Sequence, residues 1–304
     1  MANLTMESST IAAFAQTLNA RESASLFFEP ARSGVISWNT YAPKGRLLFR
    51  LLRAHVPATD WYDYAEWHSS GRNSFSAQSD RDGLRVEVDL IRAEQPFDGI
   101  ELFAEGVDFN LLAFSSPLRA RPSMPYARDA MILDVPARSQ FVVEGERGWC
   151  SPTSLSMVNA YHGIDESVEQ TARAVADRAY NGTGNWAFNV AHSGSLGLRA
   201  VVAFLQNLDH AQRLIERNLP VVLSYSWSGA ELPGAPLEHS DGHLVVLCGF
   251  TADGDCAIND PAAPAGRVVY PRSAIEAVWQ RNEGLAYVIA PVGIDYADIL
   301  TANA

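Results

Sequence analysis

Short apolar runs dominate the first third of the chain, and several of them alternate apolar with polar positions. Gly, Pro, Asp and Ser separate these runs, which is the pattern of β-strands joined by turns. Several short strands at this spacing are typical of an antiparallel β-sandwich. We therefore predict a β-sandwich domain over residues 1–125. Its expected strands are residues 24–29, 34–40, 45–53, 84–92, 99–104 and 109–114.

Aromatic and polar side chains alternate over part of residues 60–68, with Trp61, Tyr62, Tyr64 and Trp67 at the aromatic positions. Aromatic side chains fit the pleated surface of a half-buried strand, so this stripe favours a place in the core. The alternative is an exposed face on which a sugar or a peptide stacks. We expect the core position.

The composition changes at residues 116–130, which are rich in Pro and Arg and which we interpret as a linker. Beyond them, apolar positions first recur at helical spacing and then form strand-like runs. Helices followed by strands describe an α+β domain, which we place at residues 126–304. Its expected helices are residues 151–162, 167–178, 185–193, 197–205 and 210–217, and a strand is expected at residues 221–226.

Length and charge narrow the range of functions. The chain has 304 residues with 47% hydrophobic side chains, enough to bury the cores of two domains. Its net charge of −12 repels nucleic-acid phosphates and anionic membranes, so we expect neither partner. No apolar run approaches about 18 residues, and residues 1–8 lack the features of an export signal. We expect a cytoplasmic protein whose oligomeric state the sequence leaves open.

The three cysteines are too scattered for a disulfide framework, and we expect Cys248 and Cys256 to be buried free thiols. Cys150 differs, because Pro152 and Gly163 frame a helix that starts beside it. A helix N-terminus favours an anion, which lowers the pKa of a thiol and raises the fraction of nucleophilic thiolate. The alternative for Cys150 is a buried core thiol.

A β-hairpin is expected near the C-terminal end of the second domain. An apolar strand opens with His243, an Asp-Gly turn follows, and the next strand ends in Asn259 and Asp260. With the Asp-Gly pair as the turn, Asp260 faces Leu247 on the side of His243, and Asn259 lies on the other side. That register separates Asp260 from His243 by roughly 13 Å along the strand. A turn two residues earlier, near residues 251 and 252, keeps Asp260 on the same face as His243 and shortens the distance between them. Both registers stay open.

These positions supply the groups that covalent thiol catalysis needs. Cys150 offers a nucleophile, His243 a base that takes its proton, and Asp260 a carboxylate that orients the imidazole. Gln140 is the expected side-chain donor to an oxyanion, with the backbone N–H of Cys150 as its companion. The alternatives are a structural histidine at a strand end for His243 and a turn residue before proline for Asp260.

Four motifs follow one another along the chain: Gln140, Trp149-Cys150-x-Pro152-x-Ser154, Gly242-His243-Leu244-Val245-Val246 and Asn259-Asp260-Pro261. In this order they resemble the bacteriocin-processing (double-glycine leader) peptidase-like family of papain-fold cysteine peptidases, over residues 130–292. The resemblance implies a papain-like cysteine peptidase domain in which Cys150 attacks and His243 is the base. It also implies that Asp260 orients the imidazole and that Gln140 lines the oxyanion hole.

Two features depart from the family pattern. Family members usually carry Gly directly after the nucleophile, whereas this chain has Ser151, whose side chain restricts the backbone. The chain carries no fused transporter, so we do not expect a double-glycine leader as its substrate. Its N-terminal β domain is more similar to that of stand-alone bacterial relatives.

Trp149, Trp186 and Gly242 are the residues that we expect to bind substrate along the cleft. Trp186 follows a glycine-rich loop, and a core position is its alternative. We expect no cofactor and no metal, because His239 and His243 lack a third ligand.

The sequence therefore predicts a cysteine peptidase or amide hydrolase that acts on a peptide or amide through an acyl-thioester. Two alternatives stay open. One is a non-catalytic peptide- or glycan-binding protein on a degenerate peptidase fold, and the other is a thiol acyltransferase.

Overall fold

The computed structural model describes residues 11–12, 23–104, 106–124, 129–145 and 147–301. Residues 1–8, on which the expectation of no export signal depends, lie outside the described residues. The chain divides into two compact units. The first comprises Met1–Pro117, Val175–Val202 and Leu300–Ala304, and the second Leu118–Ala174 and Ala203–Ile299. The predicted domains are each one continuous stretch, whereas the first unit also takes in Val175–Val202.

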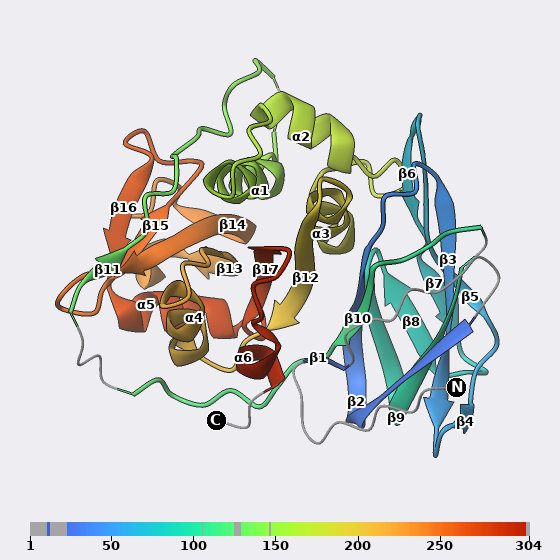
Figure 1. The fold of residues 1–304 in the computed structure, drawn as a ribbon. Coiled ribbons are helices and arrows are strands. Elements are labelled where there is room, and N and C mark those ends of the chain that lie inside the picture. Colours follow the sequence, from blue (N-terminus) through green and yellow to red (C-terminus); the bar gives the residue numbers. More distant parts are fainter. Residues whose placement is uncertain (1–10, 13–22, 105, 125–128, 146, 302–304) are drawn as a thin grey trace. The chain divides into compact units, whose positions relative to one another are not determined.

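An antiparallel sheet of ten strands forms the first unit (Figure 1), with the order β1-β10-β2-β9-β3-β5-β6. Off this path, β4 pairs with β3, and β8 pairs with β9 and β7. The strands are β1 (Ile11–Ala12), β2 (Ser23–Asn39), β3 (Gly45–Arg53), β4 (Val56–Pro57), β5 (Tyr62–His68), β6 (Gly71–Ser74), β7 (Ala77–Ser79), β8 (Leu84–Glu87), β9 (Leu90–Ala104) and β10 (Leu111–Ser115).

Two strands of this sheet are longer than the sequence pattern predicts. β2 joins the strands expected at residues 24–29 and 34–40, with register shifts around Pro30. Proline has no N–H for the ladder, so the pairing with β9 is interrupted at this point and then resumes. The strand expected at residues 84–92 is split into β8 and β9 by a turn at Val88, which has a φ of 60°. The antiparallel sheet is as predicted, and its sandwich arrangement stays a prediction.

Aromatic side chains fill the core of the first unit. Tyr64 and Trp67 of β5 are 1% and 7% exposed, so the core position predicted for the aromatic stripe is confirmed for these two residues. It is wrong for Trp61, which precedes β5 and is 37% exposed, and Tyr62 is only half-buried. Trp38 of β2 stacks on Trp67 with ring centroids 5.5 Å apart. Helix α3 (Trp186–Ser195) joins this core through Phe188, whose ring meets Trp38 edge to face at 5.8 Å.

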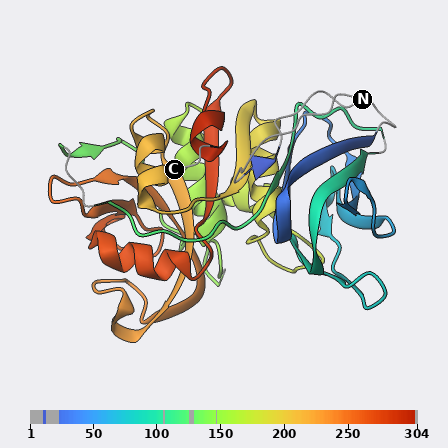
Figure 2. The ribbon, with the colours of Figure 1, turned by 90° about the horizontal axis from the view of Figure 1, so that it is seen from below.

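A seven-stranded sheet with the order β12-β17-β13-β14-β15-β16 forms the framework of the second unit, and β11 pairs with β14. The boundary between the units falls within β12. Helix α1 lies on one face of this sheet, and α4 and α5 lie on the other (Figures 1 and 2). The elements are β11 (Met131–Ile132), α1 (Cys150–Tyr161), α2 (Val168–Val175), β12 (Leu198–Phe204), α4 (Leu208–Ile215), β13 (Val221–Ser228), η1 (Gly229–Glu231), β14 (His239–Phe250), β15 (Cys256–Asn259), β16 (Arg267–Tyr270), α5 (Arg272–Gln280), β17 (Leu285–Pro291) and α6 (Ala297–Thr301).

The predicted helix at residues 197–205 is wrong, because this segment forms strand β12. Every side chain of β12 except Arg199 is buried. A strand covered on both faces has a continuous apolar sequence without alternation, so its periodicity does not distinguish it from a buried helix. The β-branched pair Val201 and Val202 favours the extended form. The other four predicted helices are present as α1, α2, α3 and α4.

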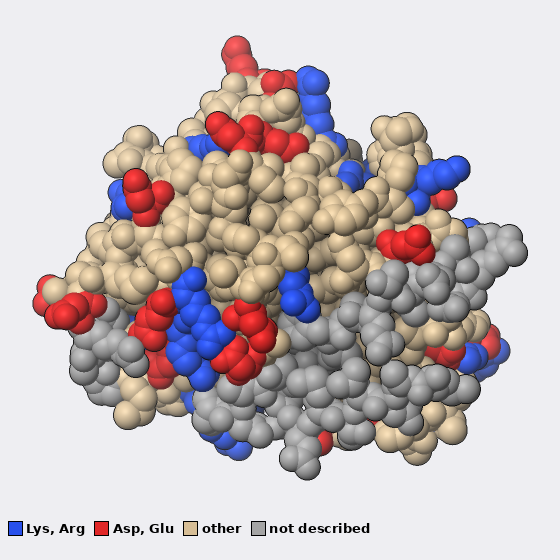
Figure 3. Space-filling view, viewed as in Figure 1, with Lys and Arg blue, Asp and Glu red and all other residues tan. Residues whose placement is uncertain are grey.

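Charged side chains of both signs lie next to one another on the face shown in Figure 3. Two ion pairs of the second unit, Arg217 with Asp298 and Arg272 with Asp209, have this arrangement. Within the described ranges, no helix is both long and apolar enough to cross a membrane.

Candidate active site

Cys150 is the first residue of α1, and its side chain is partly exposed. The N-cap residue Trp149 makes no side-chain cap hydrogen bond, and Pro152 has no N–H to offer. The N–H groups of Cys150 and Ser151 are therefore among those that the first turn leaves without an intrahelical partner. The positive end of α1 thus faces the thiol without a competing side-chain cap.

His243 and Asp260 form a buried hydrogen-bonded pair. His243 Nε2 lies 2.7 Å from Asp260 Oδ1, and the two residues are 2% and 1% exposed. The carboxylate also accepts hydrogen bonds from the N–H of Ala262 at 2.9 Å and from the hydroxyl of Tyr270 at 3.1 Å. Three donors on different segments therefore fix the orientation of Asp260, and Asp260 in turn fixes the imidazole.

The pairing of β14 with β15 explains how these two side chains meet. Val246 pairs with Asn259, and the continuation of this register places Asp260 level with Val245. His243 precedes Val245 by two residues, so its side chain lies on the same face as Asp260. The predicted hairpin is confirmed, but neither predicted register is observed. The Asp-Gly turn places Asp260 opposite Leu247 and the earlier turn places it opposite His243, whereas the observed register lies between the two.

Electrostatic interactions favour a thiolate and an imidazolium in this site. Burial raises the pKa of Cys150, but a hydrogen bond from His243 and its charge outweigh burial and lower the pKa overall. The backbone N–H groups of Leu244 and Ser151 lower it further. Burial lowers the pKa of His243, yet its hydrogen bonds to Asp260 and Cys150 raise it to about 9. Because Nε2 of His243 faces Asp260, Nδ1 is the ring nitrogen left for the sulfur.

The other two cysteines differ from Cys150. Cys248 and Cys256 are buried free thiols, as predicted. Burial raises the pKa of Cys248 to about 11 and raises the pKa of Cys256 as well. Both thiols are therefore protonated and unreactive near neutral pH.

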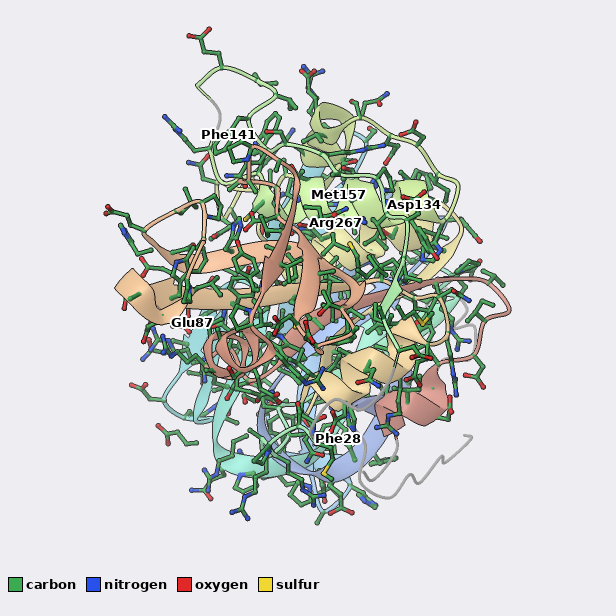
Figure 4. All side chains as sticks on the ribbon, turned by 90° about the vertical axis from the view of Figure 1, so that its left-hand side faces the viewer. Phe28, Glu87, Asp134, Phe141, Met157 and Arg267 are labelled. Atoms are coloured by element: carbon green, nitrogen blue, oxygen red, sulfur yellow. The ribbon has the colours of Figure 1, made fainter. Side chains whose placement is uncertain are left out.

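Gln140 lies on the segment that leads to α1. Its backbone N–H donates to the carbonyl of Pro261 at 2.9 Å, which ties this segment to the residue after Asp260. The side-chain Oε1 is buried and has no hydrogen-bond partner among the described residues. The same amide carries Nε2, which is a donor and therefore the kind of group from which an oxyanion accepts a hydrogen bond. The next residue, Phe141, is 50% exposed on the loop that leads to Cys150 (Figure 4).

The three residues expected to bind substrate lie in different surroundings. Trp149 is 9% exposed and packs against Val168 and Ala172, so its ring stabilises the start of α1. Gly242 is exposed, and no atom lies within 4 Å of the position that a Cβ would take there. Trp186 begins α3 in the first unit. Their contact with a substrate stays a prediction.

Trp227 and Tyr270 belong to the site, and the sequence reasoning missed both. The ring of Trp227 lies 5.6 Å from that of His243 and is itself 3% exposed, so it shields the imidazole from water. Tyr270 reaches Asp260 from β16. Neither aromatic residue lies in a recognisable motif. A signal for Trp227 was its position at the end of the strand predicted at residues 221–226, beside the strand that carries His243.

No group of three or more His, Cys, Asp or Glu side chains in the described part of the chain could hold a metal ion.

A protein-family model matches the chain. The model described as Peptidase_C39 like family matches residues 132–287, more than half of the chain. The matched range contains Gln140, Cys150, His243 and Asp260. A search of curated proteins gives no match.

Solved structures also resemble the chain, and each covers about half of it. A C39-like peptidase from Bacillus anthracis is 21% identical and covers 54% of this chain and 98% of its own, with a TM-score of 0.42. A double-glycine-motif protease from an AMS/PCAT transporter, in complex with the leader peptide, is 19% identical and covers 54% and 100%, with a TM-score of 0.36. The peptidase domain of Streptococcus ComA is 15% identical and covers 54% and 99%, with a TM-score of 0.36.

Proposed function

Because the chain belongs to the peptidase C39-like family, we propose that it is a cysteine peptidase or amide hydrolase that acts through an acyl-thioester on Cys150. One observation carries this proposal. The Cys150 thiol, the His243 imidazole and the Asp260 carboxylate form a continuous hydrogen-bonded series, with pKa shifts that favour the charged nucleophile. Such a series is what nucleophilic catalysis by a thiol requires.

In the first half-reaction, the Cys150 thiolate attacks the carbonyl carbon of a peptide or amide, and a C–S bond forms. The carbonyl oxygen becomes an oxyanion, which the N–H of Cys150 and the amide of Gln140 stabilise. The C–N bond then breaks as the His243 imidazolium gives its proton to the leaving amine. The acyl group remains on sulfur as a thioester.

In the second half-reaction, neutral His243 takes a proton from water, and the hydroxide adds to the thioester carbonyl. The C–S bond breaks, the carboxylic acid leaves, and the thiolate–imidazolium pair is restored. Asp260 keeps Nε2 of His243 engaged throughout, so Nδ1 stays directed to the reacting atoms.

The domain arrangement that we propose is a papain-like domain that follows an antiparallel β-sandwich. In the second unit, a helix with the nucleophile at its N-terminus lies on an antiparallel sheet that carries the histidine and the carboxylate, and this supports the papain-like description. The long strands β2 and β9 support the sandwich, because each changes register along its length. We propose peptides or simple amides as substrates and leave the double-glycine leader aside.

Alkylation by iodoacetamide at about pH 6 tests the nucleophile directly. An ordinary thiol with a pKa of about 8.5 is almost inert at that pH, whereas we expect Cys150 to react quickly. Mass spectrometry of the intact protein then shows one modified site, and Cys248 and Cys256 serve as internal controls because they react only after unfolding. The variant His243→Asn slows the reaction at pH 6, whereas His239→Asn, at an exposed position of the same strand, does not.

Cleavage is tested with a mixture of peptides from a denatured protein, compared between the wild type and Cys150→Ala. New peptide termini are expected only with the wild type. Slow alkylation of Cys150 at pH 6 in the folded protein, or identical termini from both proteins, would overturn the proposed function.

A further inference from the structure

Ser151 occupies the position at which family members usually carry glycine, and the structure gives its side chain a partner. Ser151 is fully buried, and its Oγ lies 2.9 Å from the hydroxyl of Tyr287 on β17. Ser151 lies within the first turn of α1 and is not among the residues with a positive φ. Serine therefore fits this backbone without strain, and the first turn of α1 is hydrogen-bonded to the central sheet.

The backbone of the same residue faces the nucleophile. The N–H of Ser151 is one of the groups that stabilise the Cys150 thiolate. Ser151 thus follows the nucleophile directly in α1, and its side chain binds β17. The bond to Tyr287 restrains the position of the Ser151 Cα, and the N–H attached to this Cα is restrained with it.

The second N–H that faces the sulfur is fixed in a similar way. The N–H of Leu244 also stabilises the Cys150 thiolate, and the carbonyl of Leu244 accepts a hydrogen bond from Ser154 Oγ at 2.9 Å. Each backbone donor is therefore linked to a hydrogen bond between a buried serine of α1 and the sheet. Ser151 itself binds Tyr287, and Leu244 is bound by Ser154. The two bonds are directed to different strands, β17 and β14, so they limit the position of the first turn in two directions.

We propose that the buried hydrogen bond between Ser151 Oγ and Tyr287 makes Ser151 a positioning residue, which holds its own N–H against the Cys150 sulfur. This inference rests on the proposed function, since it concerns the activation of the same nucleophile. The position matters because a hydrogen bond to a charged sulfur weakens steeply when the donor is displaced or tilted. The chain thus uses a serine and a tyrosine where glycine provides no side-chain anchor.

The test measures the rate of Cys150 alkylation by iodoacetamide against pH in three proteins: the wild type, Ser151→Ala and Tyr287→Phe. Both variants remove one hydroxyl and keep the remaining shape of the side chain. We expect the midpoint of the pH profile to rise by roughly half a unit to one unit in each, which lowers the rate at pH 6 roughly three- to tenfold. The control Ser156→Ala removes a buried hydroxyl that donates to Thr153 O within α1 and binds no strand in the described part of the chain, and its profile stays that of the wild type.

The double variant Ser151→Ala/Tyr287→Phe separates positioning from a general loss of stability. Removing both partners leaves neither hydroxyl of the pair unsatisfied, so the melting temperature should recover toward that of the wild type. The pH profile should stay shifted, because the anchor is still absent. The inference is overturned if the single variants keep the wild-type profile, or if the double variant regains it. A wild-type Cys150 that is inert at pH 6 would instead reject the proposed function.

Discussion

Asp260 accepts a hydrogen bond of 2.7 Å from His243 across two neighbouring strands, and both side chains are shielded from water. Water does not compete for either side chain at this position, so the interaction between the imidazolium and the carboxylate is strong. The bond also selects the ring nitrogen that faces Asp260 and leaves the other for the sulfur. Its removal should therefore affect both the charge and the orientation of His243.

Asp260→Asn tests this relationship. The amide keeps the shape of the side chain and one acceptor oxygen, but it carries no charge to stabilise the imidazolium. We expect the rate of peptide cleavage to fall by roughly 10²- to 10⁴-fold, and the alkylation of Cys150 at pH 6 to slow. Asp253→Asn, at an exposed position in the loop of the same hairpin, is the matched control. Equal rates in the two variants would show that Asp260 does not assist His243.

The pH dependence of activity should have two limbs. On the acid side, protonation of Cys150 removes the nucleophile, and this limb lies below the ordinary range for a thiol because the pKa of Cys150 is lowered. On the alkaline side, His243 loses its proton as the pH rises through its pKa of about 9, so the acid that protonates the leaving amine is lost. A profile of kcat/KM against pH checks both limbs. An alkaline limb near the ordinary histidine value of about 6.5 would contradict the thiolate–imidazolium pair.

Stability should follow the same titration. The pKa of His243 is higher in the folded chain than its ordinary value of 6.5, so the folded state binds the proton more tightly than the unfolded state. The resulting stabilisation is fully present below the unfolded pKa and is lost as the pH rises through about 9. Urea unfolding at several pH values measures it, with His243→Asn as the reference that lacks this titration. Parallel curves for the two proteins would contradict the expectation.

Asn259 and Asp260 are neighbours in the chain, but Asn259 stabilises the fold whereas Asp260 orients His243. Substitutions should distinguish these two roles. Asn259 is fully buried on the other face of β15, where its Nδ2 donates to Val135 O at 2.9 Å and its Oδ1 accepts from Arg267 Nε at 2.8 Å. Asn259→Ala should lower the free energy of unfolding by about 1 to 3 kcal/mol, because buried partners lose their hydrogen bonds. The pH profile of Cys150 alkylation in the folded variant should not move. A shifted profile at unchanged stability would contradict this assignment.

The sequence predicted the helix and the hairpin that carry the candidate residues, but it did not predict how the strands of the hairpin pair. The helix that starts at Cys150 was predictable, because Pro152 and Gly163 mark its two ends. The hairpin was predictable from its Asp-Gly turn, but its register was not. The loop between Phe250 and Cys256 is longer than a two-residue turn, and a register shift between Leu247 and Gly249 adds a residue to β14. Both effects bring Asp260 nearer to His243, and neither leaves a periodic signal.

The sequence pattern does not predict which distant segments come into contact. Tyr270 reaches Asp260 only because β16 pairs with β15, and Tyr287 reaches Ser151 only because β17 passes beneath the start of α1. Tyr287 lies in the apolar strand β17 and Tyr270 ends the short strand β16, and neither sequence indicates which residue the tyrosine contacts. The same limit explains β12, since a strand covered on both faces shows no alternation.

Asp89 supplies the last prediction, which concerns the first unit. Its Oδ2 accepts the N–H groups of Trp186 at 2.5 Å and Ala187 at 3.1 Å, so it stabilises the N-terminus of α3. Burial raises the pKa of this carboxyl to about 7, and the charge of Asp177 contributes, although the backbone N–H groups oppose the shift. The folded chain therefore binds this proton more tightly than the unfolded chain does. The stabilisation is full below the ordinary value of 3.8 and is lost as the pH rises through about 7.

Asp89→Asn keeps an acceptor oxygen for α3 but cannot ionise. We expect it to be more stable than the wild type at about pH 8 and to approach the wild type toward about pH 5, as measured by urea unfolding followed by tryptophan fluorescence. Asp89→Ala also removes the acceptor and should be about 1 to 2 kcal/mol less stable than Asp89→Asn at either pH. Asp80→Asn, at an exposed turn, is the control for a change of net charge. Removing the charge of a buried carboxylate should raise the free energy of unfolding, whereas removing that of an exposed one should change it little. If Asp89→Asn and Asp80→Asn change the free energy of unfolding equally at both pH values, burial of Asp89 does not cause the effect.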